Sequence, residues 1–366
     1  MAGAAAISAG GTVVGYAALP SADFHAFRWD SSLQELVPLM GDTQSHAMAV
    51  DNLGTAVGVS YLMGAINPHA ARWQSALPVA LGTFAPRAMN EVGTVIGHTS
   101  TAMSGRGWVD RACRFADGSL TLLPTLGGSF SYASGVNDAG QIVGMSHTTA
   151  DDLRRACMWW NDQPSDLGTL GGANSQAYAI NAPGQVVGIS DTVAGQPHAF
   201  LYTLNGSGQV LSRADLGELG GGYSAAYALN SFGEVVGTSD SRAFYWHQDG
   251  MVDLARRIPP GSGWVLSAGA AINEGGQIAG TGYYQGWPQV FVLTPVAPDY
   301  DHDGDVDQED FGHFQLCYTG SGVSQEDPNC WNALLDGDDA VDGDDFDVFQ
   351  RCSNGPSVPA DPGCWR

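Results

Sequence analysis

Residues 178–188 read Tyr-Ala-Ile-Asn-Ala-Pro-Gly-Gln-Val-Val-Gly. Asn181 suits the first position of a tight turn, and Gly184 suits the left-handed conformation that ends it. Short apolar runs lie before and after these two residues. The stretch therefore predicts two short antiparallel strands joined by a type I turn with a bulge.

The same pattern occurs seven times in residues 1–296. The turn glycines are Gly11, Gly54, Gly93, Gly140, Gly184, Gly233 and Gly276. Their spacings are 43, 39, 47, 44, 49 and 43 residues, so the period is about 44. A fixed period of this length is the signature of a repeat architecture.

Two further motifs complete each repeat. A His-Ala-Phe motif at residues 25–27 and 198–200 predicts a third strand, and Asp-Leu-Gly at residues 166–168 and 215–217 predicts a fourth. Four short strands at this period are typical of one blade of a β-propeller. The sequence thus predicts an all-β, seven-bladed β-propeller over residues 1–296. A β-helix or solenoid is the alternative, although its coils usually have shorter periods.

The repeats resemble the HAF family of extracellular repeats, named for His-Ala-Phe. The resemblance implies an extracellular setting but no defined reaction. In the third and fourth repeats Cys113 and Cys157 replace the phenylalanine. Equivalent positions of neighbouring blades usually lie too far apart for a disulfide, so we expect these cysteines to be unpaired. No fourth strand is recognisable after Phe291, so we expect an irregular junction between blades one and seven.

A column of basic side chains recurs once per repeat. It contains His25, His69, Arg111, Arg155, His198 and Arg242. A residue that recurs in every blade normally serves the blade, whereas residues that do chemistry should break the repeat. We find no set that does so, and no Gly-x-Ser-x-Gly or zinc-binding spacing. The lack of lysine excludes a phosphate-loop lysine and a Schiff base. A pair of acids for glycoside hydrolysis stays open, because separation in space is invisible here.

The net charge of −24 is concentrated at the C-terminal end. Residues 299–366 contain 17 acidic residues and two arginines, which leaves −15 there and −9 in the first 298 residues. Nucleic acid is therefore not an expected partner. No apolar run reaches the length of a membrane span. Met1 runs almost directly into the first repeat without a secretory signal, so we expect the natural N-terminus to lie upstream.

Residues 299–310 have the spacing of a calcium loop. Acidic side chains occupy loop positions 1, 3, 5, 9 and 12, and Gly304 occupies position 6; the acids are Asp299, Asp301, Asp303, Asp307 and Asp310. Calcium takes six to eight oxygen ligands, and a glycine at position 6 permits the sharp turn around the ion. We expect a strong calcium site here.

A second copy of this loop follows 35 residues later. It retains Asp336, Asp338, Asp342 and Asp345. However, Leu334 replaces the acid at position 1, and Asp339 replaces the glycine at position 6. A residue other than glycine strains the turn if φ must be positive. We therefore expect weak calcium binding or none at this second loop.

Residues 297–366 form the second predicted domain, a duplicated module. Phenylalanines three residues apart after each loop predict a short helix with an apolar face, at Phe311 and Phe314 and again at Phe346 and Phe349. This module resembles the dockerin family, in its cysteine-containing variant that ends in Gly-Cys, here Gly363-Cys364. The resemblance implies extracellular anchoring to a cohesin-like or cell-surface protein.

The resemblance also implies the ligands. The first loop would use the side chains of Asp299, Asp301 and Asp303, the carbonyl of Asp305, Asp307 directly or through water, and both oxygens of Asp310. The matching positions of the second loop are Asp336, Asp338, Ala340, Asp342 and Asp345. The four C-terminal cysteines allow three pairings, and the duplication favours Cys317 with Cys330 and Cys352 with Cys364.

The sequence is compatible with two functions. The first is a non-catalytic extracellular protein whose propeller binds a polysaccharide or a protein and whose module anchors it. The alternative is an extracellular carbohydrate-active enzyme, a glycoside hydrolase or lyase, anchored by the same module. The fold does not separate them, because propellers host both. The absence of a recognisable repeat-breaking set favours binding.

Overall fold

The computed structural model describes residues 2–21, 23–64, 68–103, 107–151, 153–248, 250–258, 261–294, 298–300, 305–336, 338–356, 358 and 364. Within these residues the strands form seven separate antiparallel sheets, six with four strands and one with three. The seven-bladed β-propeller is thereby confirmed, and the β-helix is excluded.

Blades one to four follow one another along the chain. Blade one contains β1 (Ala2–Ile7), β2 (Val13–Ala18), β3 (Phe24–Trp29) and β4 (Leu33–Leu36). Blade two contains β5 (Gln44–Val50), β6 (Ala56–Tyr61), β7 (His69–Trp73) and β8 (Pro78–Gly82). Blade three contains β9 (Ala85–Met89), β10 (Val95–Met103), β11 (Gly107–Ala116) and β12 (Ser119–Leu122). Blade four contains β13 (Gly127–Val136), β14 (Ile142–Thr148), the 3₁₀ turn η1 (Thr149–Asp151), β15 (Arg154–Trp160) and β16 (Gln163–Gly168).

Blades five to seven complete the ring. Blade five contains β17 (Gly171–Ile180), β18 (Gln185–Thr192), β19 (Pro197–Leu204) and β20 (Val210–Asp215). Blade six contains β21 (Ser224–Leu229), β22 (Val235–Ser239), β23 (Arg242–His247) and β24 (Gly250–Asp253), followed by the 3₁₀ turn η2 (Leu254–Arg257). Blade seven contains β25 (Trp264–Ile272), β26 (Ile278–Tyr284) and β27 (Trp287–Leu293).

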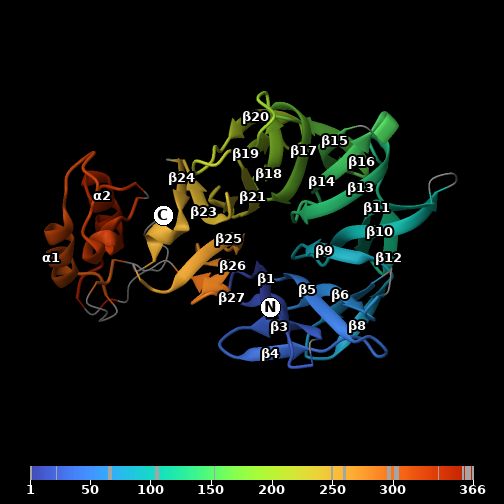
Figure 1. Cartoon of the computed structure of the whole chain (residues 1–366), viewed down its shortest axis with the longest axis horizontal. Coiled ribbons are helices and arrows are strands. Elements are labelled where there is room, and N and C mark those ends of the chain that lie inside the picture. Colours follow the sequence, from blue (N-terminus) through green and yellow to red (C-terminus); the bar gives the residue numbers. More distant parts are fainter. Residues whose placement is uncertain are drawn as a thin grey trace.

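The first strand of each blade is the innermost. Each first strand contacts the first strands of both neighbouring blades, in the circular order β1, β5, β9, β13, β17, β21, β25 and back to β1. Each fourth strand lies at the outer edge, beside the third strand of its own blade. Figure 1 shows this arrangement, with the first strands around the centre. Side chains on the first strands are therefore the ones that can reach the propeller axis.

The turn of residues 181–184 has the predicted form. The Gly184 amide donates to the Asn181 carbonyl at 3.2 Å, and the Asn181 amide donates to the Gln185 carbonyl at 3.0 Å. Gly184 has φ of +85°, a left-handed conformation that costs glycine little. The His-Ala-Phe motif lies on the third strand and Asp-Leu-Gly on or just after the fourth, as predicted.

The hydrophobic core lies between adjacent blades. Between blades four and five, Met158 and Leu167 pack against Phe200 and Tyr202, all buried. A repeated serine joins the blades as well: the Ser175 hydroxyl on β17 accepts the amide of Ala156 on β15 at 2.9 Å. The alanine of the third-strand motif is thus small enough to pack against the next blade. Its buried amide keeps a hydrogen-bond acceptor there, the serine hydroxyl.

Cys113 and Cys157 are buried free thiols, which confirms the expectation that they are unpaired. Burial raises the pKa of the Cys113 thiol to about 12 and raises that of Cys157 further. Because the thiolate is the reactive form, the raised pKa keeps Cys113 in its unreactive thiol form at pH 8. We expect N-ethylmaleimide to label neither residue in the folded protein and both in urea, as read by mass spectrometry. Labelling of either thiol at the rate of a free cysteine in the folded protein would contradict this.

Blade seven closes the ring although it has only three described strands. β1 packs against β25, β26 and β27, much as the other first strands pack on the blade before them. The Asn273 side chain of blade seven donates to the Ser8 carbonyl of blade one at 3.0 Å. The predicted lack of a fourth strand is confirmed for the described residues, but the packing at the junction is regular.

The C-terminal region is small and helical. It contains α1 (Gln308–Cys317), the 3₁₀ turn η3 (Pro328–Ala333) and α2 (Gly343–Cys352). Disulfides join Cys317 to Cys330 and Cys352 to Cys364, so the favoured pairing is confirmed. Phe314 and Phe349 share one core with both bridges. None of the helices that the structure describes has both the length and the apolar character to cross a lipid bilayer.

Candidate functional site

Every blade carries a β-bulge at one fixed place in its first strand. In blade five Ala177 pairs with Gly188 and Ala179 with Val187, so Tyr178 has no partner of its own. Gly188 permits this arrangement, since a Cβ there would lie 2.0 Å from the carbonyl oxygen of Gln176. Two residues that oppose one bend the strand and redirect a side chain.

The seven bulged residues form what we call the axial ring. They are Ala5, Met48, Arg87, Ser134, Tyr178, Tyr227 and Ala270. All seven are partly or fully exposed to solvent. Since they lie on the innermost strands, we place them around the axis of the propeller. The blades are repeats, yet these seven positions hold five different residue types.

The axial ring is therefore a set that varies among the repeats, and the search of the sequence for residues that do chemistry did not identify it. The signal was present in the sequence. The ring position lies three residues before the turn column, as Tyr178 does before Asn181. Its neighbours on both sides are small apolar residues in most repeats, while the position itself ranges from alanine to arginine and tyrosine. A comparison by columns would have found it.

Two tyrosines of the axial ring lie side by side, with arginine charges near one of them. The rings of Tyr178 and Tyr227 lie 5.6 Å apart, edge to face. Burial raises the pKa of Tyr178, while the positive charges of Arg87 and Arg154 act in the opposite direction. Both arginines are exposed, and neither has an ion pair among the described residues. Arg87 of the axial ring and Arg154 of the third strand of blade four thus add positive charge near Tyr178.

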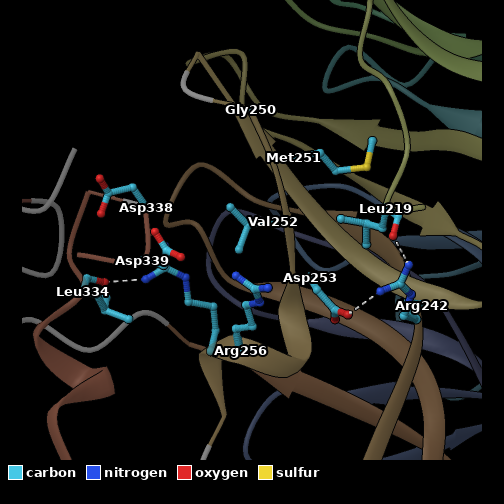
Figure 2. Close-up of a pocket in the computed structure, with 11 residues that line it drawn as sticks. Leu219, Arg242, Gly250, Met251, Val252, Asp253, Arg256, Leu334, Asp338 and Asp339 are labelled. Carbon is cyan, nitrogen blue, oxygen red and sulfur yellow. Dashed lines mark hydrogen bonds and ion pairs between the residues drawn. The ribbon is translucent and has the colours of Figure 1, made fainter. Parts of the chain in front are cut away.

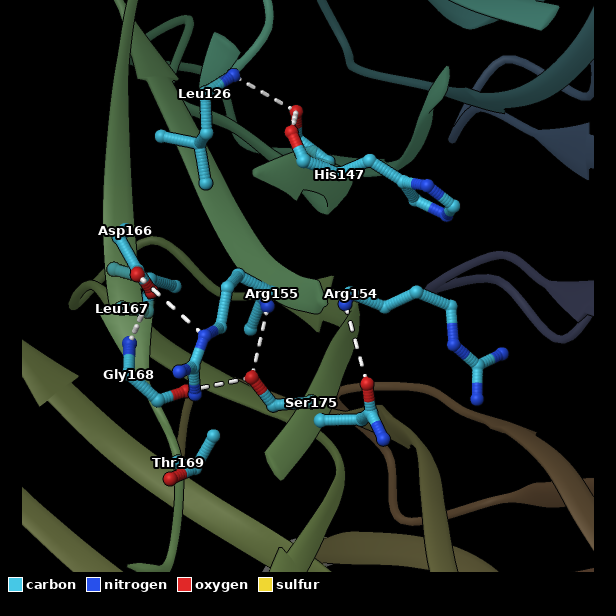
Figure 3. A network of polar contacts seen from close by, with 12 residues as sticks. Leu126, His147, Arg154, Arg155, Asp166, Leu167, Gly168, Thr169 and Ser175 are labelled. Carbon is cyan, nitrogen blue, oxygen red and sulfur yellow. Dashed lines mark hydrogen bonds and ion pairs between the residues drawn. The ribbon is translucent and has the colours of Figure 1, made fainter. Parts of the chain in front are cut away.

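Arg154 extends away from its own blade. Figure 3 shows the side chains of Arg154 and His147 pointing to the same side, whereas Arg155 turns towards Asp166. The Arg155–Asp166 pair is 3.8 Å long. Burial lowers the pKa of His147, while the charge of Asp151, 3.8 Å away, acts in the opposite direction. Arg154 carries a positive charge on the side to which both side chains point.

The recurring basic column serves the blades, as predicted. His69 lies 2.9 Å from Asp42, His198 lies 2.9 Å from Asp215, and Arg242 lies 3.4 Å from Asp253. For His198 and Arg242, the contact joins the start of a third strand to the end of the fourth strand of the same blade. His69 instead contacts the segment just before its own blade. The column thus holds the outer part of the blades together.

The described groups of three acids close enough to share one metal ion all lie in the C-terminal region. In the first loop these are Asp305, Asp307 and Asp310, whose carboxylate oxygens lie within 4.8 Å of one another. Carboxylate oxygens are ligands that calcium prefers, and three of them would supply part of its coordination shell. Asp299 is described but is not in this group, and Asp301 and Asp303 lie outside the described residues. The group uses the Asp305 side chain, whereas the dockerin resemblance assigns its carbonyl.

Helix capping positions the two last acids of the first loop. Asp307 is the N-cap of α1 and accepts the Glu309 amide at 2.8 Å. Asp310 in turn accepts a hydrogen bond from the Asp307 amide at 2.8 Å. This capping box fixes both carboxylates at the start of the helix. A carboxylate accepts up to about four hydrogen bonds, so the capping bonds by themselves do not prevent these carboxylates from binding an ion.

The second loop has the same capping box at its end but different residues at its first positions. Asp342 and Asp345 form the equivalent capping box on α2. Asp336, Asp338 and Asp345 lie within 4.8 Å of one another, and Ala340 is buried. Leu334 offers no side-chain oxygen, and its carbonyl accepts a hydrogen bond from Arg257 of the propeller. A calcium ion would therefore lose the first ligand position of this loop.

No family model and no curated protein matches this chain. Among solved structures, the acylaminoacyl peptidase of Pyrococcus horikoshii matches with a TM-score of 0.52 and 9% identity, over 80% of this chain and 51% of that one. TolB from Acinetobacter baumannii matches with a TM-score of 0.42 and 11% identity, over 63% of this chain and 59% of that one. This chain thus spans less than two thirds of either protein. At such identity the peptidase match supports the propeller fold alone.

Proposed function

We propose that this protein is a non-catalytic extracellular binding protein. Its propeller binds a polysaccharide at the axial ring, and its C-terminal region attaches it to a cohesin-like or cell-surface partner through a calcium-loaded first loop. The observation that carries the proposal is the axial ring itself. Seven equivalent positions on otherwise repetitive strands carry five residue types, and such variation is what a binding surface on a repeat scaffold requires.

Three residues of the ring, together with the neighbouring Arg154, suggest the class of polysaccharide. Tyr178 and Tyr227 present flat apolar rings with a polar tip, which suit contact with a sugar ring. Arg87 and Arg154 present guanidinium groups, which bind planar carboxylates with two parallel hydrogen bonds. A glycan that carries carboxylates, such as a uronic acid polymer, satisfies both features. The described part of the propeller offers no group of three acids at this place.

The C-terminal region supports the second half of the proposal. Its two disulfides indicate an oxidising compartment. Asp305, Asp307 and Asp310 would hold a calcium ion, whose charge of +2 would offset most of their combined charge of −3 and couple ion binding to the folding of this region. An ordered, duplicated loop–helix unit then presents a fixed surface to a partner.

Binding of the full-length protein to a uronic acid oligosaccharide tests the proposal. We expect Tyr178→Ala and Arg87→Gln each to weaken binding by roughly tenfold, about 1.4 kcal/mol. Isothermal titration measures the change, with a neutral oligosaccharide of equal length as the comparison ligand. We expect the neutral sugar to bind more weakly and to be insensitive to Arg87→Gln.

Tyr283→Ala is the matched control. Tyr283 is also exposed, at 46%, but lies near the end of β26 and outside the axial ring. This variant should bind like the parent protein. An equal loss in Tyr283→Ala, or no binding of either glycan, would refute the axial ring as a polysaccharide site.

A further inference from the structure

One arginine of the propeller reaches the second acidic loop. Arg257 is the last residue of η2, the turn that follows the outer strand of blade six. Its Nη1 donates a hydrogen bond to the carbonyl oxygen of Leu334, at loop position 1. Figure 2 shows this bond as the dashed line at Leu334. Within the described residues, the guanidinium group thus contacts the backbone of the residue that replaces the first acidic ligand of the loop.

The loop around this guanidinium carries uncompensated negative charge. The carboxylates of Asp336, Asp338 and Asp345 lie within 4.8 Å of one another. The negative charges of these three acids attract the Arg257 guanidinium group. Among the described residues none of them forms an ion pair with it, so the attraction acts at longer range than a salt bridge. Like charges held this close favour a cation beside them.

The contact borders a partly open pocket of about 390 Å³ between blade six and the C-terminal region. Figure 2 shows Leu334, Asp338 and Asp339 on one side and Val252 and Arg256 on the other. Arg256 lines the same pocket but is exposed and has no hydrogen bond or ion pair among the described residues. Arg256 therefore serves as the matched control for Arg257, because only Arg257 has a described hydrogen bond to the second loop.

We propose that Arg257 takes the place of a calcium ion at the second loop and thereby fastens the C-terminal region to blade six. The loop needs positive charge to hold its three acids together, and the propeller supplies it. Calcium is then bound at the first loop only. The second loop serves as an intramolecular docking surface, whatever the propeller binds.

Amide hydrogen exchange of the full-length protein, with and without calcium, tests this. In calcium-free buffer we expect Arg257→Gln to speed exchange in residues 334–345 by about tenfold, while Arg256→Gln leaves it unchanged. Peptides from blade six should exchange as in the parent, which shows that the blade is still folded. Arg257→Lys keeps the charge and should retain part of the protection.

Calcium provides the decisive comparison. In the parent protein, calcium should slow exchange in the first loop and leave the second unchanged. In Arg257→Gln, calcium should slow exchange in the second loop as well, because an ion now replaces the lost guanidinium. The proposal is overturned if the parent's two loops respond equally, if Arg257→Gln and Arg256→Gln behave alike, or if calcium fails to protect the second loop of Arg257→Gln.

Discussion

Replacement of Asn230 by alanine is expected to lower the free energy of unfolding of the propeller by about 3 kcal/mol. Asn230 is 2% exposed. Its Nδ2 donates to the Asn273 carbonyl of the next blade at 3.1 Å, and its Oδ1 accepts the Glu234 amide at 3.2 Å. Alanine would remove both of these side-chain partners from buried backbone groups. An unsatisfied buried group costs more than the bond itself contributes.

Asn205→Ala is the control, because it removes the hydrogen bonds of a turn without removing a contact between blades. Asn205 opens an equivalent turn in blade five, and its Oδ1 accepts the Gln209 amide at 2.9 Å. That turn is exposed and makes no hydrogen bond to another blade among the described residues. Its variant should therefore cost less than about 1 kcal/mol. Urea unfolding followed by tryptophan fluorescence measures both values. Equal losses would mean that the contact between blades contributes nothing.

These asparagine contacts explain why the number of blades and their strands could be predicted. Asn181, Gly184 and the small residues around them interact within a few residues of one another. The local sequence of each repeat therefore determines its local structure. The Asn137 side chain also donates to the Asn181 carbonyl at 3.1 Å, and the Asn181 side chain to the Asn230 carbonyl at 2.9 Å. The residue that makes the turn therefore also joins the blades, and one motif predicts both.

The axial ring and the Arg257 contact could not be predicted in the same way. The variation at the position of Tyr178 can be seen in the sequence, but its β-bulge and its place near the axis follow only from strand pairing, which depends on the tertiary fold. Arg257 and Leu334 are 77 residues apart in the chain. Nothing in the local sequence around either residue indicates the other. The sequence predicts weak calcium binding or none at the second loop. The guanidinium group that we propose in place of the calcium ion comes from the propeller, a distant part of the chain.

The second large effect concerns the disulfide between Cys317 and Cys330. Serine at both positions is expected to destabilise the C-terminal region by about 3 kcal/mol, because the bridge closes a loop of 13 residues in the unfolded chain. Both sulfur atoms also belong to a small core, and a core of this size leaves little stability in reserve. In calcium-free buffer we therefore expect the C-terminal region of this variant to be unfolded at 37 °C.

Calcium should restore the folded state of this variant, because an ion that binds only the native loop adds about 2.7 kcal/mol at a hundred times its dissociation constant. Scanning calorimetry of the full-length variant, with chelator and with calcium, measures the transition of the C-terminal region. The transition of the propeller in the same scan is the internal control, since its blades contain neither cysteine of the bridge. If the C-terminal region melts at the parent's temperature in chelator, the bridge does not stabilise it. If calcium restores nothing, the first loop does not couple ion binding to folding.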